Sequence, residues 1–278
     1  MFVIRSKFDV FIEAISVFDL TWSLEAMSKT KISLKYYWEA FGFINKNKLW
    51  WSYAIPIAFN TILLGLLVYC SMKIGSSAQN TLDRLILSYI SIPESWAFIK
   101  NLVDAFIYII VIVTCLMLYL FIFKYIIFIL LGPFFSYIGD LAQNRLNGEQ
   151  SKLSLKTLIL SLKVSLIVNL RLLTLQSFWM ILAYITMIIP ILNLLSPFLL
   201  LIIEFYFSGA SIINNNCERA LMTKSQTTDF YKRNRAYLPG LGMGFWIIML
   251  IPLIGWVIAP IIAVVASVLL YEKEKLHA

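Results

Sequence analysis

Two long stretches of apolar residues constrain this chain more than any other feature of its sequence. They run from about Trp51 to Met72 and from about Leu102 to Leu131. A helix needs about 20 apolar residues to cross the roughly 30 Å hydrocarbon core of a bilayer, and both stretches meet that length. Since hydrocarbon offers no water to backbone amides, such segments must satisfy their hydrogen bonds internally. The two stretches therefore predict two long transmembrane helices.

The composition excludes a water-soluble fold. Of the 278 residues, 60% are hydrophobic and 14% are charged, whereas soluble domains are about half apolar and about a quarter charged. The three cysteines, Cys70, Cys115 and Cys217, lie in different segments without CxxC spacing, so neither a disulfide framework nor a zinc site is indicated. We expect no metal and no cofactor.

The distribution of positive charge predicts the topology. The net charge is +8, from 23 Lys and Arg against 15 Asp and Glu, and the excess lies between apolar blocks. Nucleic acid is therefore not an expected partner. Because Lys and Arg favour the cytoplasmic side, we expect the N-terminus, the loops near Asn147 and Gln226 and the C-terminus in the cytoplasm. The polar connection 73–100 has the weakest basic bias and should face outward. These features predict a multi-pass inner-membrane protein.

Two segments have the periodicity of amphipathic helices on a membrane surface. In 35–45, one face is apolar and the opposite face carries Lys35, Glu39 and Asn45. The apolar residues are Tyr36, Tyr37, Phe41 and Ile44. In 152–166, three lysines lie close to one face and leucines cover the other, which indicates a helix lying on anionic lipid. Membrane lipid is thus an expected partner.

The last half of the chain contains an internal repeat. Residues 187–197 and 249–260 both read as an Ile-Pro break, a short turn and a second proline. Proline removes a backbone donor and interrupts a helix. The later arms, about 241–251 and 260–271, have roughly 11 to 12 residues, or about 16 to 18 Å of helix, which is too short to cross. The earlier block fits either a hairpin of half-helices or two short spans.

These elements predict an all-α integral membrane protein. It would contain two long transmembrane helices, two Pro-broken helical hairpins of half-penetrating helices, and interfacial amphipathic helices. Paired broken helices recur in transport proteins, where a helix end offers its dipole to an ion.

One acidic residue could carry chemistry inside the apolar blocks. Glu204 is the only acidic or basic residue in the stretch 172–213. Such a residue inside an apolar segment is a functional candidate by default. The alternative is a protonated glutamate paired to a neighbour. Arg219 lies in a basic connection that anchors topology or attracts an anion. The one histidine, His277, is next to the C-terminus, and no catalytic motif occurs, so we do not expect an enzyme.

The stretch 132–148, Gly-Pro-Phe-Phe-Ser-Tyr-Ile-Gly-Asp-Leu-Ala-Gln-Asn-Arg-Leu-Asn-Gly, resembles the signature of the CysZ sulfate permease family, which includes the etoposide-induced membrane proteins. The matching positions are Pro133, Phe134, Asp140, Arg145, Leu146 and Gly148. The Ile-Pro turns at Pro190 and Pro252, the Asn-Asn-Asn-Cys-Glu-Arg219 connection and the glycines at 240–244 also resemble the family in order. The similarity covers roughly 34–271.

The resemblance implies two transmembrane helices, two pairs of half-penetrating helices, a homo-oligomer and sulfate uptake. Where the permeases carry a sulfate-contacting Gly-x-Arg-Arg motif, this chain reads Lys48-Leu49-Trp50-Trp51. Tryptophan donates one N–H and carries no charge, whereas a sulfate site needs charge-assisted donors. Lys46 and Lys48 are the cations that remain beside it, and with Glu204 and Arg219 they are the candidate ligand-binding residues.

The sequence predicts three regions: a cytoplasmic extension at 1–33, a CysZ-like membrane domain at 34–271 and a cytoplasmic tail at 272–278. The first functional hypothesis is a permease for sulfate or another small inorganic anion. The second is a membrane scaffold or lipid-interacting regulator that transports nothing.

Overall fold

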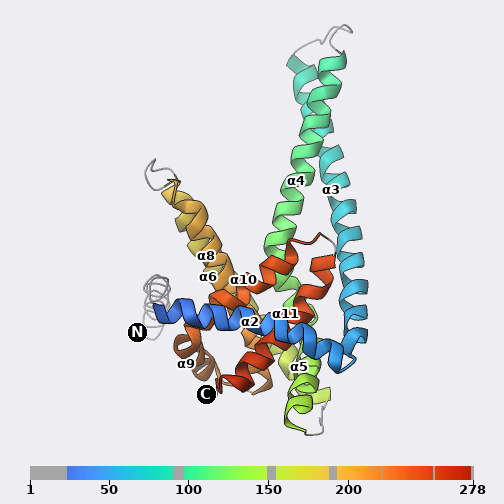
Figure 1. Ribbon diagram of the computed structural model, residues 1–278. Helices are drawn as coiled ribbons and strands as arrows, with labels where there is room; N and C mark the ends of the chain where they lie inside the picture. Colours follow the sequence, from blue (N-terminus) through green and yellow to red (C-terminus); the bar gives the residue numbers. More distant parts are fainter. Residues whose placement is uncertain are drawn as a thin grey trace. The chain divides into compact units, whose positions relative to one another are not determined.

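The computed structural model describes residues 24–89, 97–148, 155–187, 193–220, 222–252 and 254–276. Throughout these ranges every regular element is a helix (Figure 1), which confirms the all-α prediction. Among the described residues, five helical stretches are long and apolar enough to cross a membrane, which indicates a multi-pass membrane protein. They are Leu49–Thr81, Lys100–Tyr119, Leu166–Thr186, Ser196–Arg219 and Ile254–Lys273.

The chain divides into two compact units, and the smaller one comprises residues 57–124. It contains most of α3 (Ala54–Tyr89) and α4 (Ala97–Leu130). The ring of Tyr108 fills the space beside Gly75, and the Gln79 side chain donates to the backbone oxygen of Asp104 at 3.1 Å. The polar connection predicted at 73–100 is thus largely helical, because these contacts between α3 and α4 extend both helices beyond their apolar stretches.

The larger unit comprises residues 1–56 and 125–278. Its elements are α2 (Leu24–Lys46), η1 (Leu49–Tyr53), α5 (Gly132–Asn147), α6 (Leu155–Thr186), α8 (Ser196–Arg219), α9 (Lys224–Asn234), η3 (Arg235–Tyr237), α10 (Leu238–Met249) and α11 (Ile254–Lys273). Helix α11 is the centre of the core: its residues from Ala259 to Leu270 are buried, and it contacts α2, α5, α8 and α10.

Helix α11 differs from the predicted second arm of the later block. The prediction began that arm at Pro260, but the helix begins at Ile254 and contains Pro260 in its interior. A proline inside a helix costs about 3 kcal/mol. Burial of the apolar residues that follow Pro260 outweighs this cost, so the helix continues through the proline and is 20 residues long. The break at Pro252 is present, since Pro252 lies in the turn between α10 and α11.

The earlier block forms α6 and α8, whose ends lie next to each other. The hydroxyl groups of Thr186 and Ser196 are 2.8 Å apart, and Pro197 occupies the first turn of α8. The predicted break at Pro190 lies outside the described residues. The predicted separate interfacial helix in 152–166 is instead the start of α6, which continues into the apolar stretch, because no helix-breaking residue separates the two segments.

Helices α8 and α10 cross at a point where their backbones almost touch. A Cβ atom on Gly242 would lie 1.7 Å from the backbone oxygen of Phe205, and one on Gly209 would lie 1.9 Å from that of Leu238. Only glycine permits this approach. The glycine-rich stretch at 240–244 thus has a packing role at a helix crossing.

Helix α2 packs against the rest of the larger unit through the helix face that was predicted to be apolar. Tyr36, Tyr37 and Ile44 are buried, and Tyr37 donates to the backbone oxygen of Leu241. The prediction placed this face on the membrane, but the larger unit itself covers it. Phe41 is an exception, with 46% of its surface exposed. Periodicity identified an apolar face without determining what covers it.

Candidate functional site

The family-like stretch 132–148 forms helix α5, and its signature residues set the bounds of that helix. Pro133 lies in the first turn, where the missing N–H costs little, and Gly148 ends the helix with a φ of 72°. The Phe134 ring lies 6.4 Å from that of Trp51. Arg145 is exposed. The helix thereby holds Asp140 at a fixed position facing the end of α8.

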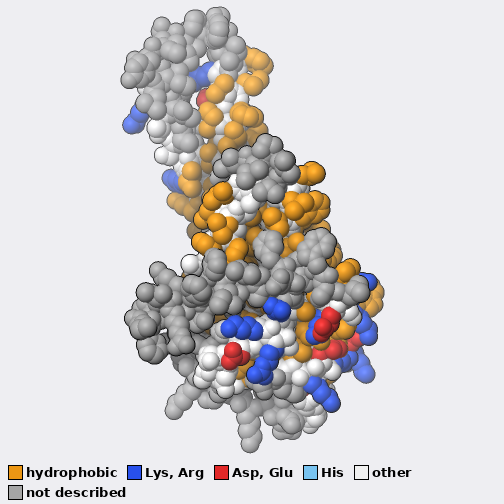
Figure 2. Space-filling view, turned by 90° about the vertical axis from the view of Figure 1, so that its left-hand side faces the viewer, with side chains coloured by type: hydrophobic (Ala, Val, Ile, Leu, Met, Phe, Trp, Pro, Cys, Tyr) orange, Lys and Arg blue, Asp and Glu red, His pale blue; other side chains and the backbone are white. Residues whose placement is uncertain are grey.

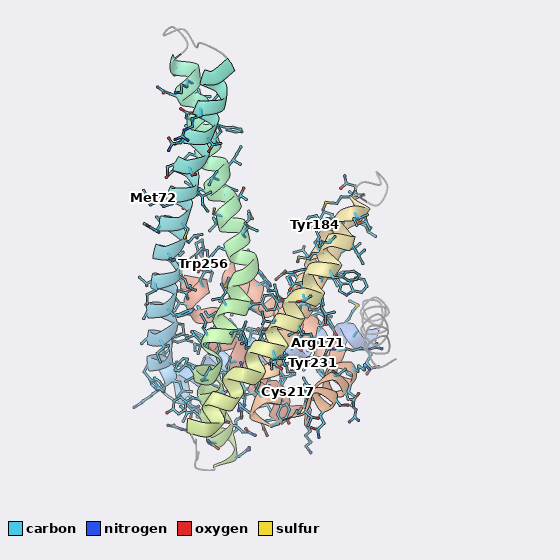
Figure 3. All side chains as sticks on the ribbon, turned by 180° about the vertical axis from the view of Figure 1, so that it is seen from behind. Met72, Arg171, Tyr184, Cys217, Tyr231 and Trp256 are labelled. Atoms are coloured by element: carbon cyan, nitrogen blue, oxygen red, sulfur yellow. The ribbon has the colours of Figure 1, made fainter. Side chains whose placement is uncertain are left out.

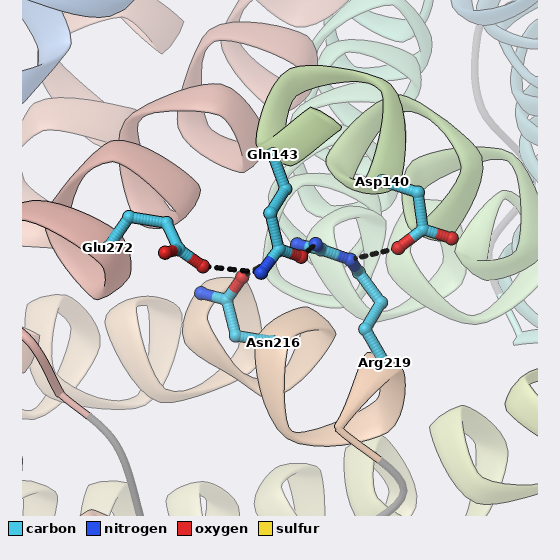
Figure 4. Close-up of polar contacts among 5 residues, drawn as sticks. All are labelled: Asp140, Gln143, Asn216, Arg219 and Glu272. Atoms are coloured by element: carbon cyan, nitrogen blue, oxygen red, sulfur yellow. Dashed lines mark hydrogen bonds and ion pairs between the residues drawn. The ribbon is translucent and has the colours of Figure 1, made fainter. Parts of the chain in front are cut away.

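Asp140 and Arg219 form an ion pair across 79 residues of sequence (Figure 4). The guanidinium Nε donates to the carboxylate Oδ1 at 2.6 Å. The Arg219 side chain is 7% exposed, whereas that of Asp140 is 27% exposed. Arg219 is a predicted ligand-binding residue and Asp140 a predicted signature residue, and the structure joins them in one cluster.

Three further residues, which the sequence analysis missed, complete the Arg219 cluster. The other two guanidinium nitrogens donate to the side-chain oxygens of Asn216 and Gln143, and Gln143 in turn donates to Glu272 (Figure 4). The cluster therefore joins α5 to the C-terminal ends of α8 and α11. The oxygens of Asp140, Asn216 and Gln143 accept hydrogen bonds from the guanidinium group. The cluster therefore fixes the Arg219 side chain in place. The spacing of Asp140 and Gln143 on one helical face was the signal that sequence reasoning could have used.

Glu204 lies in a second polar cluster, in the apolar half of α8. Its carboxylate accepts hydrogen bonds from Gln176 on α6, from Ser208 at 3.2 Å and from the Trp246 indole at 3.1 Å. Gln176 accepts from the hydroxyl of Tyr125. These donors are neutral, and they satisfy both carboxylate oxygens. No pattern in the sequence indicated the partners on other helices, Gln176 on α6 and Trp246 on α10.

The four predicted ligand-binding residues do not form one site. Lys46 ends α2 and Lys48 follows it with a φ of 55°, and both are exposed. Glu204 and Arg219 are both on α8, but the 15 positions between them correspond to about 22 Å along the helix. Beside the lysines, the Trp50 indole donates to Asn45 at 3.3 Å, so this N–H already has a protein acceptor.

A cavity of about 280 Å³ with both apolar and polar lining residues lies between α6 and α9. Its polar lining comes from Arg171, Thr227, Thr228 and Tyr231, and Figure 3 shows Arg171 beside Tyr231. A guanidinium group near several hydroxyl groups is suited to hydrogen bonding with an oxyanion. Neither Arg171 nor the threonines were predicted as site residues, because their proximity depends on how α9 packs against α6.

Ion pairs shift the acidity of groups on α2. The hydrogen bond from Lys273 lowers the pKa of Glu39 below its ordinary value of 4.5, against a smaller effect of burial. The hydrogen bond from Lys29 lowers the pKa of Glu25 in the same way. Within the described residues, no group of three or more His, Cys, Asp or Glu residues is arranged to hold a metal ion.

Comparison with known proteins agrees with these features. The family described as sulfate transporter CysZ/etoposide-induced protein 2.4 matches residues 36–260. No curated protein matches the chain. The match covers most of the chain, from α2 into α11, and includes the whole of α5 and both members of the Asp140–Arg219 pair. The chain therefore belongs to the sulfate transporter CysZ/etoposide-induced protein 2.4 family.

Proposed function

We propose that the protein is a CysZ-type permease that carries a small inorganic anion, with sulfate as the first candidate, across the inner membrane. The observation that carries this proposal is the family match over residues 36–260, in a chain whose described part contains five helices suited to a membrane. The family is one of transporters, which argues against an enzyme. The net charge of +8 also favours an anionic substrate.

The cavity between α6 and α9 supports recognition of an oxyanion. The Arg171 guanidinium lines this cavity together with hydroxyl groups. Arg171 lies near the start of Leu166–Thr186, one of the stretches suited to crossing a membrane. In this chain, tryptophans occupy the positions at which the permeases carry two sulfate-contacting arginines. Arg171 would then supply the charge-assisted donor that these positions lack. Lys46 and Lys48 remain exposed cations that raise the local anion concentration.

The proposed arrangement contains two long transmembrane helices, α3 and α4, and two returning helix pairs. Helix α10, with 12 residues, is about 18 Å long and too short to cross. We propose that both termini are cytoplasmic and that copies of the chain form a homo-oligomer. In a cysteine-free background, Asn147→Cys and Ser225→Cys should react with an impermeant thiol reagent only from the cytoplasmic side. Labelling of Ser225→Cys from outside would mean an odd number of crossings between the two positions.

The direct test is radiolabelled sulfate flux into proteoliposomes containing the purified full chain. We expect saturable uptake that unlabelled oxyanions reduce by competition. Arg171→Gln should lower uptake by about tenfold, because a charge-assisted hydrogen bond contributes about 1.5 to 3 kcal/mol. Arg145→Gln is the matched control, since this exposed arginine lies outside the cavity. An oligomer that incorporates correctly and takes up no anion would contradict the proposal.

A second candidate function, as a lipid-interacting scaffold, is favoured by the outer side of α2. Trp38 is 84% exposed, and Met27 is 53% exposed, so large apolar side chains remain uncovered on a helix that also carries lysines. Such a helix binds at a membrane surface. Headgroup-dependent vesicle binding without any anion flux would favour this function over transport.

A further inference from the structure

An apolar groove of about 500 Å³ lies between α2, α8 and α10, away from the two polar clusters. Its walls are carbon-rich: Met27 and Leu34 from α2, Phe198, Leu201 and Phe205 from α8, and Met243 from α10. Lys31 also lines it and supplies its charge. The groove lies entirely within the larger unit.

The walls of the groove remain open to the surroundings. Phe198 is 63% exposed, Leu201 is 50% exposed and Met27 is 53% exposed. Phe198 and Leu201 belong to Ser196–Arg219, one of the stretches suited to crossing a membrane. An unfilled groove in hydrocarbon would forfeit dispersion contacts along its lining, so a flexible hydrocarbon chain is the occupant that its chemistry favours.

Lys31 is the charged residue among those that line this groove. Helix α2 lies across α8, and α8 extends beyond it toward the end of the α6–α8 pair (Figure 1). From Phe205 to Phe198 the groove follows α8 for about 10 Å. Lys31 lies on α2, and the exposed Lys35 follows one turn later. On the face shown in Figure 2, Lys and Arg side chains gather together with acidic ones on the lower part of the view.

We propose that this groove binds one acyl chain of an anionic glycerophospholipid whose phosphate pairs with Lys31. The acyl chain lies along α8 between α2 and α10, and the headgroup lies beside α2. Hydrocarbon fits the carbon-rich walls, and a negative phosphate complements the ammonium group. The bound lipid connects a surface helix to a membrane-crossing helix, and this role is independent of anion transport.

The test measures lipid binding to the purified, delipidated full chain by native mass spectrometry and thermal unfolding. Phosphatidylglycerol, phosphatidylcholine with the same acyl chains, and glycerol 3-phosphate are added separately. We expect phosphatidylglycerol to bind about fivefold more tightly than phosphatidylcholine and to raise the unfolding temperature. Glycerol 3-phosphate should do neither, because it has no acyl chain.

Two variants distinguish the effect of the Lys31 charge on lipid binding from the effect of the groove itself. Each variant has a matched control. Lys31→Gln should remove the fivefold preference for phosphatidylglycerol, whereas Lys35→Gln should retain most of it. Leu201→Trp should reduce binding of both lipids by at least fivefold, because the larger side chain occupies the groove. Ile247→Trp alters an exposed position on α10 outside the groove and should not affect binding.

Three results would overturn the proposal. The first is equal binding of both lipids to the wild type and to Lys31→Gln. In the second, Leu201→Trp changes the oligomeric mass and leaves the lipid count unchanged, which would make the groove an interface between copies. In the third, lipid binds only after removal of residues 1–23, which would show that the chain's own N-terminal segment occupies the groove.

Discussion

The guanidinium Nε of Arg219 lies 2.6 Å from the carboxylate Oδ1 of Asp140, and this pair joins the C-terminal end of α8 to the middle of α5. Arg219 is nearly buried, and Gln143 and Asn216 hold its other nitrogens. The stability of the fold therefore depends on the partner of Arg219, since loss of the Asp140 carboxylate would leave a nearly buried positive charge poorly compensated.

We therefore predict that Asp140→Asn lowers the free energy of unfolding by about 2 kcal/mol. This lies between the cost of breaking a fully buried pair, about 3 to 5 kcal/mol, and that of a surface pair, about 0 to 1 kcal/mol. Chemical denaturation in detergent would measure it. Arg145→Gln, on an exposed part of the same helix, should stay within about 0.5 kcal/mol. A double-mutant cycle of Asp140→Asn with Arg219→Gln that shows no coupling would contradict this interpretation.

Gly242→Ala and Gly42→Ala should change stability in opposite directions. A Cβ on Gly242 meets the backbone of Phe205, which cannot move without displacing α8, so we expect a loss of about 1 to 3 kcal/mol. A Cβ on Gly42 meets nothing within 4 Å, and alanine should stabilise α2 by about 0.5 to 1 kcal/mol. Thermal unfolding of both variants provides the comparison. A neutral Gly242→Ala would show that the two helices do not approach this closely.

The Glu39–Lys273 pair predicts a pH-dependent contribution to stability. The two charged groups are 2.6 Å apart, and Lys273 lowers the pKa of Glu39 in the folded protein below its ordinary 4.5. A lowered folded-state pKa means that the pair stabilises the fold above pH 4.5 and loses this effect as the pH falls through the folded-state pKa. Because both side chains are partly exposed, the contribution should be about 0.2 to 1 kcal/mol.

Comparison of the wild type with Lys273→Gln at several pH values tests this contribution. Their unfolding free energies should differ at pH 7, and the difference should shrink below pH 4. Lys275→Gln, which alters a nearby exposed lysine, should show no such pH dependence. A difference that stays constant from pH 7 to pH 3 would exclude titration of Glu39 as its cause.

We predict that Glu204→Gln leaves stability within about 1 kcal/mol of the wild type but lowers anion flux and removes its pH dependence. The glutamine can still accept from Trp246, and its amide can donate to Gln176 if the Gln176 amide turns toward the Tyr125 hydroxyl, which can accept. The cluster is therefore satisfied with or without a carboxylate, so a change in flux would report the loss of the acidic group itself.

The control for this prediction is Glu204→Leu, which removes the carboxylate acceptor of the Gln176 amide and leaves the Trp246 indole with Ser208 as its acceptor. This substitution should cost about 1 to 3 kcal/mol. Flux and its pH profile in proteoliposomes are the decisive measurements. Wild-type flux with a wild-type pH profile in Glu204→Gln would assign the carboxylate a structural role only.

Particular elements show what local sequence signals specify. Pro133 and Gly148, which the sequence analysis used only as family-signature positions, bound α5, because a proline fits the first helical turn and a glycine fits a positive φ. The reasoning failed at Pro260, where the same local signal predicted a helix start. There, packing around α11 outweighs the lost hydrogen bond.

The sequence by itself determined the class of protein, since apolar segments of membrane-crossing length and the signature in 132–148 are properties of consecutive residues. Only the tertiary structure decided which groups meet. Glu204 gains partners from α6 and α10, Arg219 meets Asp140 across 79 residues, and α2 buries Tyr37 against α10. Helical periodicity specifies which face of a helix is apolar or polar. The partner of that face depends on how helices distant in the sequence cross, and the close contact of Gly242 with α8 determines one such crossing.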